Sequence, residues 1–532
     1  MAKALQVSPL RLDAKAEILF CGTEPVALGR RAVALLRLLV ERAGTPVSKE
    51  MLIRAAWPGL AVEESNLTVQ IAALRRALGE QADGAGWIET LRGRGYRYLG
   101  PAIPITNAPE NAPGPPARSL PAVARPDRPA VAVLPFSAPG VDSDHAHFAD
   151  GMVEDIITAL SRFRSLLVIA RNSSFVYRGK AVDIKQVGCE LGVRYVVEGS
   201  VRKTDRELRV AVQLVDAESG YQLWSERYDR ALADVFAVQD EIARAVVAAL
   251  PGRLEDAGRG MAIRKPTSSM TAYDLVLLGN EQWRRLNNSG LAEARERFRA
   301  AVALDQTYAR AHANIAWTVV CAAFLETPAG MTLDDAQREI ETALDLDDGD
   351  AWSHGVFAQL LFLRKEDGRA ERHFDRALAL NPNDADVAAM FANILVYWGR
   401  WREALDWIGA AKRLNPFPPN LYHWYHALAL YSGRRYQEAI EALQGARSLH
   451  SWSLGLRAAC YARLGLLDAA RADIARFVSE RHRELRENGE AVPVDDLDLA
   501  TARAERYRHA ADRKHFLDGL RKAGLRTTRA AS

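Results

Sequence analysis

Apolar residues recur with two different spacings along the first hundred residues. Helical spacing in Arg30–Arg42, Lys49–Ala56 and Glu63–Leu78 predicts three amphipathic helices. Residues Leu5–Phe20 favour strands, and Trp87–Tyr98 predicts two short strands on either side of an Arg-Gly-Arg-Gly tip. This stretch is therefore predicted to be an α+β unit in which three helices are followed by a β-hairpin.

Two stretches interrupt these patterns and divide the chain. Residues 101–129 read PAIPITNAPENAPGPPARSLPAVARPDRP, a proline density that favours extended chain, and residues 251–271 are rich in Gly, Arg, Ser and Pro. They bound a first unit, 1–100, and a second unit, 130–250. The second unit shows the order β-α-β-α-β-β-β-α, starting with a strand at Ala130–Phe136, which predicts an α/β sandwich with a mixed sheet.

From residue 272 the apolar pattern is helical and repeats every 34 residues. A small residue, a large apolar residue and an alanine recur at Ala336/Ile340/Ala343, Ala370/Phe374/Ala377 and Ala404/Ile408/Ala411. A helix–turn–helix period of this length is typical of tetratricopeptide (TPR) repeats. The sequence predicts an all-α solenoid of about six repeats over 272–480, then a capping helix near Asp498–Leu520 within a C-terminal region of 481–532.

Composition indicates a multidomain globular protein. The 532 residues are 48% hydrophobic and 26% charged, and they exceed a single hydrophobic core. A net charge of +3 is too small to indicate nucleic-acid binding by itself, so any basic surface must be local. No stretch offers the ~20 uncharged apolar residues of a membrane span, and the four cysteines fit neither a zinc site nor a disulfide framework. We expect a reduced, cytoplasmic protein without a membrane partner, metal or other cofactor.

Two elements of the first unit carry side chains suited to DNA. The third predicted helix has an apolar stripe from Leu67 to Leu78, at steps of four, three and four. Its opposite face bears polar residues able to read bases or hold phosphate: Asn66, Thr68, Gln70 and Arg76. The hairpin tip places Arg92 and Arg94 beside glycines, where they can reach a phosphate backbone or a narrow minor groove.

The third helix, ESNLTVQIAALRRAL, and the hairpin, IETLRGRGYRYLG, resemble the OmpR/PhoB-type winged-helix family of bacterial transcription regulators. The resemblance implies an antiparallel N-terminal sheet, a recognition helix in the major groove and a wing at the adjacent minor groove. It implies that Gln70, Arg75 and Arg76 lie on or near DNA. It also implies that Arg92 enters the minor groove and that Thr90 contacts phosphate.

Three further expectations follow from this resemblance. Basic residues are common in the family where this chain has Ala72 and Ala73, so base readout is weaker here or falls on other bases. The loop Trp57–Val62 occupies the place where relatives contact RNA polymerase, which is therefore a further expected partner. The organisation resembles one-component, ToxR/CadC-like regulators, except that a membrane span is missing.

The rest of the chain resembles modules that bacteria combine. AVAVLPF, FADGMVEDIITALSRF and LWSERYDR are similar to the TolB-like domain that precedes TPR arrays and also accompanies class III adenylate cyclase domains. TPR solenoids bind peptides on the concave face formed by their first helices. In the repeat register this face includes five aromatic residues, which either anchor a protein partner or form core: Trp352, Tyr397, Trp424, Tyr431 and Trp452.

The combined pattern predicts a sequence-specific DNA-binding transcriptional regulator. A ligand or partner of the TolB-like and TPR region would control it, and a homodimer on tandem half-sites would raise its affinity for DNA. Two alternatives stay open, a TPR scaffold with a degenerate DNA-binding domain and a signalling protein related to adenylate cyclase accessory modules. The sequence contains no nucleophile elbow, HExxH motif or P-loop spacing. We therefore expect that the protein is not an enzyme and has no catalytic residues.

Overall fold

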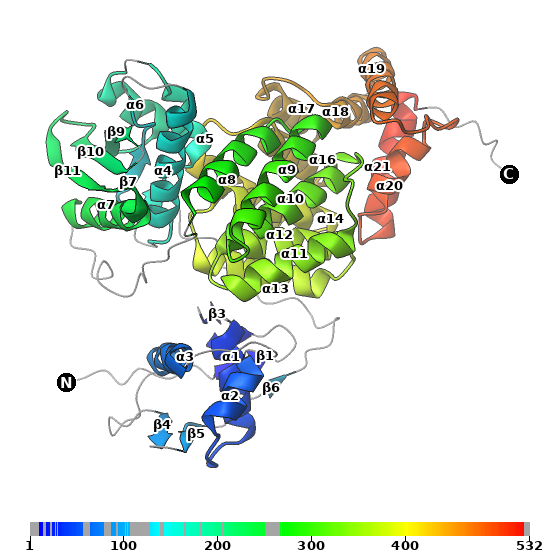
Figure 1. The fold of residues 1–532 in the computed structure, drawn as a ribbon. Coiled ribbons are helices and arrows are strands. Elements are labelled where there is room, and N and C mark those ends of the chain that lie inside the picture. The colour runs from blue at the N-terminus through cyan, green and yellow to red at the C-terminus, as the bar shows by residue number, and fades with distance from the viewer. Residues whose placement is uncertain are drawn as a thin grey trace, which may run out of the picture.

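Three folded parts make up the protein (Figure 1). The structure is a computed structural model that describes residues 10–13, 18–21, 24–26, 28, 30–56, 64–78, 87–91, 94–101, 103, 105–106, 128–138, 143–163, 166–180, 182–204, 206–250, 267 and 269–525. In Figure 1 the N-terminal unit lies below, the α/β domain to the left and the helical solenoid to the right.

The N-terminal unit has the predicted three helices and hairpin. Its helices and strands are β1 (Leu10–Asp13), β2 (Ile18–Cys21), β3 (Glu24–Pro25), α1 (Arg30–Glu41), α2 (Lys49–Ala56), α3 (Glu64–Leu78), β4 (Ile88–Leu91), β5 (Gly95–Tyr98) and β6 (Ile105–Thr106). One sheet has the order β3-β2-β1-β6, and β4 pairs with β5. The apolar stripe of α3, from Leu67 to Leu78, is buried in one core with α1 and the hairpin, as its spacing predicted.

The hairpin is attached to the helices by backbone as well as side chains. The amide groups of Val47 and Tyr96 each donate to the other residue's carbonyl, at 2.8 and 2.9 Å. Gly95 has a φ of 107°, and a Cβ there would lie 2.0 Å from the Val47 carbonyl oxygen. Only glycine tolerates both the conformation and this close approach. The chain therefore continues the hairpin sheet into the turn before α2.

The second unit is the predicted α/β domain with a mixed sheet. Its elements are β7 (Ala130–Val133), α4 (Ser143–Ser161), β8 (Leu167–Val168), α5 (Arg171–Ser174), α6 (Ile184–Leu191), β9 (Tyr195–Lys203), β10 (Glu207–Asp216), β11 (Gln222–Ala231) and α7 (Val235–Ala249). The strand order is β11-β10-β9-β7-β8, parallel around β7 and antiparallel from β9 to β11. Helices α4 and α7 pack on one face of the sheet, and α6 packs on part of the other.

The third unit is a solenoid of helix pairs. Its helices are α8 (Met270–Trp283), α9 (Asn288–Leu304), α10 (Ala309–Leu325), α11 (Leu333–Leu346), α12 (Ala351–Leu363), α13 (Asp367–Leu380), α14 (Ala385–Tyr397), α15 (Trp401–Leu414), α16 (Asn420–Ser432), α17 (Tyr436–Gln444), α18 (Ser451–Arg463) and α19 (Leu467–Glu487). The predicted register is buried, as at Ala370, Phe374 and Ala377, each 0% exposed. The pairs therefore stack through the positions that repeat every 34 residues.

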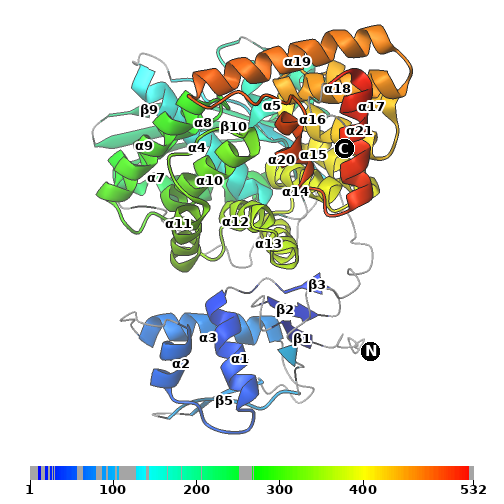
Figure 2. The same ribbon diagram turned by 90° about the vertical axis from the view of Figure 1, so that its right-hand side faces the viewer.

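The C-terminal segment forms two helices where one capping helix was expected. Helices α20 (Asp498–Ala504) and α21 (Ala510–Ala523) are separated by a break. In this break Tyr507 is buried against Tyr397, with ring centroids 5.0 Å apart, and the Arg508 amide donates to the Tyr397 carbonyl at 2.8 Å. A continuous helix could not give its backbone amide to the end of α14. Figure 2 shows α20 and α21 beside the later repeats.

The α/β domain is seated on the loops between the repeats. The Asn383 side-chain amide donates to the carbonyls of Ser161 and Phe163, at 2.9 and 3.2 Å. The Ser173 hydroxyl donates to the Asn415 side chain at 2.6 Å and accepts from the Phe417 amide at 2.7 Å. The side chains of Asn383, Ser173 and Asn415 are buried at this junction, so these bonds satisfy polar groups that the contact removes from water. Within the described residues, no helix has the length and apolar character needed to cross a membrane.

Replacing Tyr507 by alanine tests how the C-terminal segment is held. We expect the variant to lose protection of residues 498–525 from hydrogen exchange and proteolysis, because a buried ring that anchors the segment is removed. The exposed Lys514→Ala substitution in the same segment is the matched control and should leave protection unchanged. Equal protection in both variants would contradict this packing.

Candidate functional site

Arg75 joins the recognition helix to the wing. Its Nε and Nη2 atoms donate to the Ile88 carbonyl at 3.0 and 2.8 Å, and Nη2 also donates to the Thr90 hydroxyl at 2.6 Å. The guanidinium carbon lies 6.0 Å from the centre of the Tyr96 ring. A guanidinium used in this way fixes the angle between α3 and the hairpin. We therefore assign Arg75 a positioning role, and its place on or near DNA stays a prediction.

The other candidate DNA contacts divide by their place in the structure. Thr68 on α3 is exposed, Gln70 on the same helix is half-buried, and Arg94 is exposed at the hairpin tip, its amide bonded to the Leu91 carbonyl at 2.9 Å. Thr90 is exposed and accepts the bond from Arg75. Asn66 and Arg76 belong to α3, but their side chains lie outside the described residues, as do Arg92 and the Trp57–Val62 loop.

The predicted aromatic face of the solenoid is mostly covered by the chain itself. Tyr397, Trp424, Tyr431 and Trp452 are at most 4% exposed. The Arg503 guanidinium lies over Trp452 at 4.1 Å from the ring centre and over Trp424 at 5.7 Å. The Tyr431 hydroxyl donates to the His515 carbonyl at 3.1 Å. In this structure α20 and α21 occupy the surface on which a peptide partner was predicted to bind.

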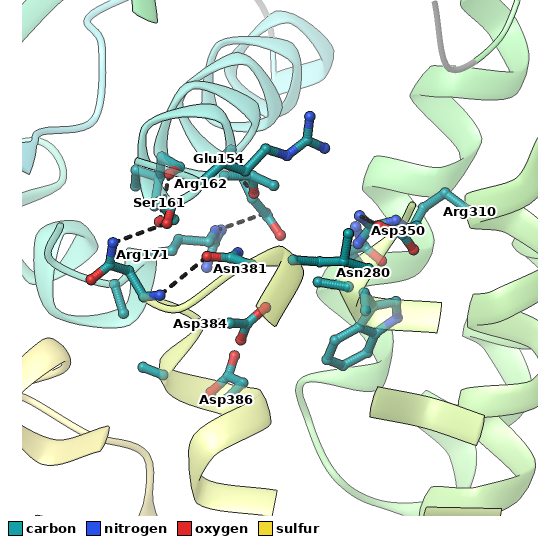
Figure 3. A pocket seen from close by; sticks show the side chains of 18 of the residues that line it. Glu154, Ser161, Arg162, Arg171, Asn280, Arg310, Asp350, Asn381, Asp384 and Asp386 are labelled. Atoms are coloured by element: carbon teal, nitrogen blue, oxygen red, sulfur yellow. Dashed lines mark hydrogen bonds and ion pairs between the residues drawn. The ribbon is translucent and has the colours of Figure 1, made fainter. Parts of the chain in front are cut away.

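Trp352, the fifth aromatic residue, lines a cavity where the α/β domain meets the solenoid (Figure 3). The cavity has a volume of about 130 Å³. Its charged lining residues come from α4, α5 and the first helices of the repeats, or from positions beside them: Glu154, Arg162, Arg171, Arg284, Arg310, Asp350, Asp384 and Asp386. The Trp352 indole N–H donates to the Asn314 side chain at 3.0 Å, so its ring is held in place.

Two groups of ion pairs lie in the lining of this cavity. Burial opposes ionisation of Glu154, but Arg284 at 2.7 Å and Arg171 at 3.0 Å more than offset it and hold the pKa of that carboxyl below its ordinary value. Arg310 pairs with Asp350 at 2.7 Å. The Glu154–Arg284 pair ties helix α4 of the α/β domain to the solenoid. Figure 3 shows Glu154, Arg171, Arg310 and Asp350 around this cavity.

Asp384 and Asp386 lie in a different environment from these ion-paired residues. Both come from the start of α14 (Figure 3). The Asp384 carboxylate caps that helix by accepting from the Val387 amide at 3.0 Å, and Asp386 accepts from the Tyr422 hydroxyl at 2.6 Å. Burial, followed by the neighbouring Asp386 charge, raises the pKa of Asp384 to about 7, and burial raises the pKa of Asp386. Two adjacent carboxyl groups that resist ionisation would be stabilised by a cation in the cavity.

The sequence interpretation did not identify these aspartates. The run NPNDAD, residues 381–386, places two acidic residues at a helix start, a pattern that ordinarily indicates helix capping. Only the fold brings this run against α4. His147 and Asp150 pair with Glu281 and Arg178, and no group of three metal-ligating side chains occurs in the described part of the chain.

Comparisons with known proteins agree with this architecture. Residues 22–98 match the family "Transcriptional regulatory protein, C terminal", and residues 127–245 match "HilA/YgeH-like transcriptional regulator, second domain". The chain thus carries an OmpR/PhoB-type winged-helix domain followed by a domain found in HilA-like transcriptional regulators. These two matches show that the chain shares domains with DNA-binding transcriptional regulators.

Individual relatives match parts of the chain. It is 24% identical to "Transcriptional regulator HilA" of Salmonella typhimurium over 72% of this chain and 66% of that protein. It is 39% identical to "Putative adenylate cyclase 3" of Rhizobium meliloti over 44% of this chain and 40% of that protein. A solved TolB from Acinetobacter baumannii is 20% identical, with a TM-score of 0.19 over 24% of this chain and 30% of that one. The chain thus spans less than two thirds of the length of these relatives.

Replacing Arg75 by alanine tests its positioning role. We expect hydrogen exchange at the hairpin amides of the full chain to rise by the equivalent of roughly 1–3 kcal/mol of local stability, because a charged donor is removed from two acceptors. The exposed Arg94→Ala substitution should leave this exchange unchanged. If both variants protect the hairpin like the wild type, Arg75 does not hold it.

Proposed function

We propose that the protein is a sequence-specific transcription regulator that inserts α3 into the major groove of DNA and its wing into the adjacent minor groove. The observation that carries this proposal is the Arg75 contact, which holds the helix and the hairpin at one fixed angle. Exposed Thr68 and Arg94 project from these two elements. A rigid pair of elements can contact two grooves without a large ordering cost on binding.

The contacts divide into two sets. On α3 the proposed contacts to bases or phosphates are Asn66, Thr68, Gln70 and Arg76. On the wing Arg92 and Arg94 enter or approach the minor groove, where arginine is favoured by the negative potential, and Thr90 contacts phosphate. The Trp57–Val62 loop is proposed to contact RNA polymerase. The domain families that match support DNA binding, and these residue roles are our proposal.

Control is proposed to act at the cavity between the α/β domain and the solenoid. Its volume of about 130 Å³ suits a small ligand. Asp384 and Asp386 have no ion-pair partner among the described residues, whereas Glu154 and Asp350 do. A small molecule with a cationic group at these aspartates would bind both units and tighten their junction. Binding would thereby change how the regulator is presented to DNA.

Selection of binding sites from random duplex DNA tests the proposed DNA recognition. The intact chain should enrich one motif, and its affinity should fall steeply with salt concentration. A variant with Thr68→Ala and Arg94→Ala should lose most of the enrichment, because one contact in each groove is removed. Arg476→Ala, an exposed change in the solenoid, is the control. Salt-sensitive binding without a motif would contradict sequence-specific regulation.

Asp384→Asn tests the electrostatics of the cavity and retains a capping residue. The folded-state pKa of about 7 lies above the ordinary value near 4, so the wild type loses stability as the pH rises from about 4 to about 7, and the last part of this loss falls above pH 6.5. We expect its melting temperature to fall between pH 6.5 and 8.5 by a few degrees more than that of the variant. Burial raises the pKa of Asp155 to about 6, which lies below this window.

The control for this measurement is Asp468→Asn, an exposed change in the solenoid that should follow the wild type. A cationic ligand should favour the ionised aspartates. Ethanolamine should therefore stabilise the wild type at pH 7 more than sodium chloride at equal ionic strength, and Asp384→Asn should reduce that difference. Identical pH profiles of the wild type and Asp384→Asn would contradict a buried, proton-binding Asp384.

A further inference from the structure

The edge of the sheet in the α/β domain is a long strand. Strand β11, Gln222–Ala231, has ten residues and pairs only through β10 in the order of the sheet. Figure 1 shows it on the outer side of the α/β domain, away from the solenoid. An edge strand offers backbone groups that can pair with another strand.

The direction of the backbone hydrogen bonds shows which residues of β11 have N–H and C=O groups that point away from the sheet. The Leu232 amide donates to the Arg206 carbonyl at 2.9 Å, directed at β10. Because direction alternates along a strand, the backbone groups of Ser225, Arg227 and Asp229 point away from the sheet. The side chain of Tyr228 is buried beneath α7, and those of Arg227 and Asp229 are exposed on the opposite face.

The charges along β11 fit a second copy of the same strand in one register. In an antiparallel pair related by a twofold axis, opposed residues lie on the same face of the sheet. A twofold at Tyr228 places Glu226 opposite Arg230 of the second copy, and Arg227 opposite Asp229 of the second copy. Moving the axis by one residue, to Arg227 or Asp229, sets that charge against itself. An axis moved by two residues, to Glu226 or Arg230, also sets the charge of that residue against the same charge of the second copy.

The start of the strand extends past the segment that this register pairs. In the register centred on Tyr228, Ser225 lies opposite Ala231 of the second copy, the last residue of β11. Tyr221, just before the strand, and Leu223, near its start, are 76% and 40% exposed and lie beyond the paired segment. Charges on an edge strand can also serve only to prevent pairing with another strand. That role does not require an order in which each charge meets an opposite charge of a second copy.

We propose that two copies of this chain associate through antiparallel pairing of their β11 strands, centred on Tyr228. The product is one continuous ten-stranded sheet, with outward hydrogen bonds at Arg227 and Asp229. This inference goes beyond the proposed function and does not depend on the identity of a ligand. It supplies a physical route to two linked winged helices, whose tethering would raise the effective concentration at tandem DNA sites.

Charge exchange across the twofold tests the proposal. The molar mass of the full chain in solution is measured by light scattering over a dilution series. Arg227→Asp sets acidic groups against each other, and Asp229→Arg sets basic groups against each other, so each should weaken dimerisation about tenfold. An equimolar mixture of the two variants should restore the dimer, because every acidic group then meets a basic one. Arg476→Asp in the solenoid is the control and should leave the dimer intact.

Each alternative result is decisive. A wild type that is monomeric throughout the series overturns the proposal. A dimer that neither substitution weakens uses another surface and also overturns it. Weakening by both variants without recovery in the mixture overturns the register, and melting temperatures of the single variants show whether they are folded. DNA binding is not part of this test, so its outcome is independent of the proposed function.

Discussion

The inner helices of the solenoid are apolar on every side, and this constraint shapes the rest of the molecule. Along α14 the buried set runs without a gap from Val387 to Tyr397, and most of α12 is buried too. A helix of this kind cannot face water on either side. One side packs on the second helices of the repeats. The other must be covered, which the α/β domain does near the helix starts and α20 with α21 does near the helix ends.

This cover also encloses the cavity at which we propose that control acts. The junction is closed by apolar contacts and by ion pairs such as Glu154 with Arg284, yet it keeps a small polar cavity at Asp384 and Asp386. Buried charges are costly unless paired, so the unpaired aspartates are the part of the junction most responsive to protons or a cation. Within the N-terminal unit a separate contact, made by Arg75, holds α3 and the hairpin together.

Local patterns predicted most of the fold, and long-range contacts account for what they missed. The stripe of α3 and the 34-residue register specified helices because each buries one face at a fixed spacing. The contact of Arg75 with the Ile88 carbonyl could not be predicted, because sequence does not show that this carbonyl lies within its reach. Sequence left open whether Trp424 and Trp452 anchor a partner or form core, because it does not show that α20 packs against them. Asp384 became a candidate only when the fold brought α4 against it.

The central claim is that α3 and the wing occupy adjacent grooves of one DNA site. The direct measurement is DNA cleavage by an iron chelate attached to a cysteine introduced at Thr68 or at Arg94, in the full chain with the exposed Cys189 replaced. The account predicts cleavage within the selected motif from position 68, and cleavage displaced by about half a helical turn, in the flanking minor groove, from position 94. Cleavage at the same sugars from both positions, or cleavage from neither, would contradict it.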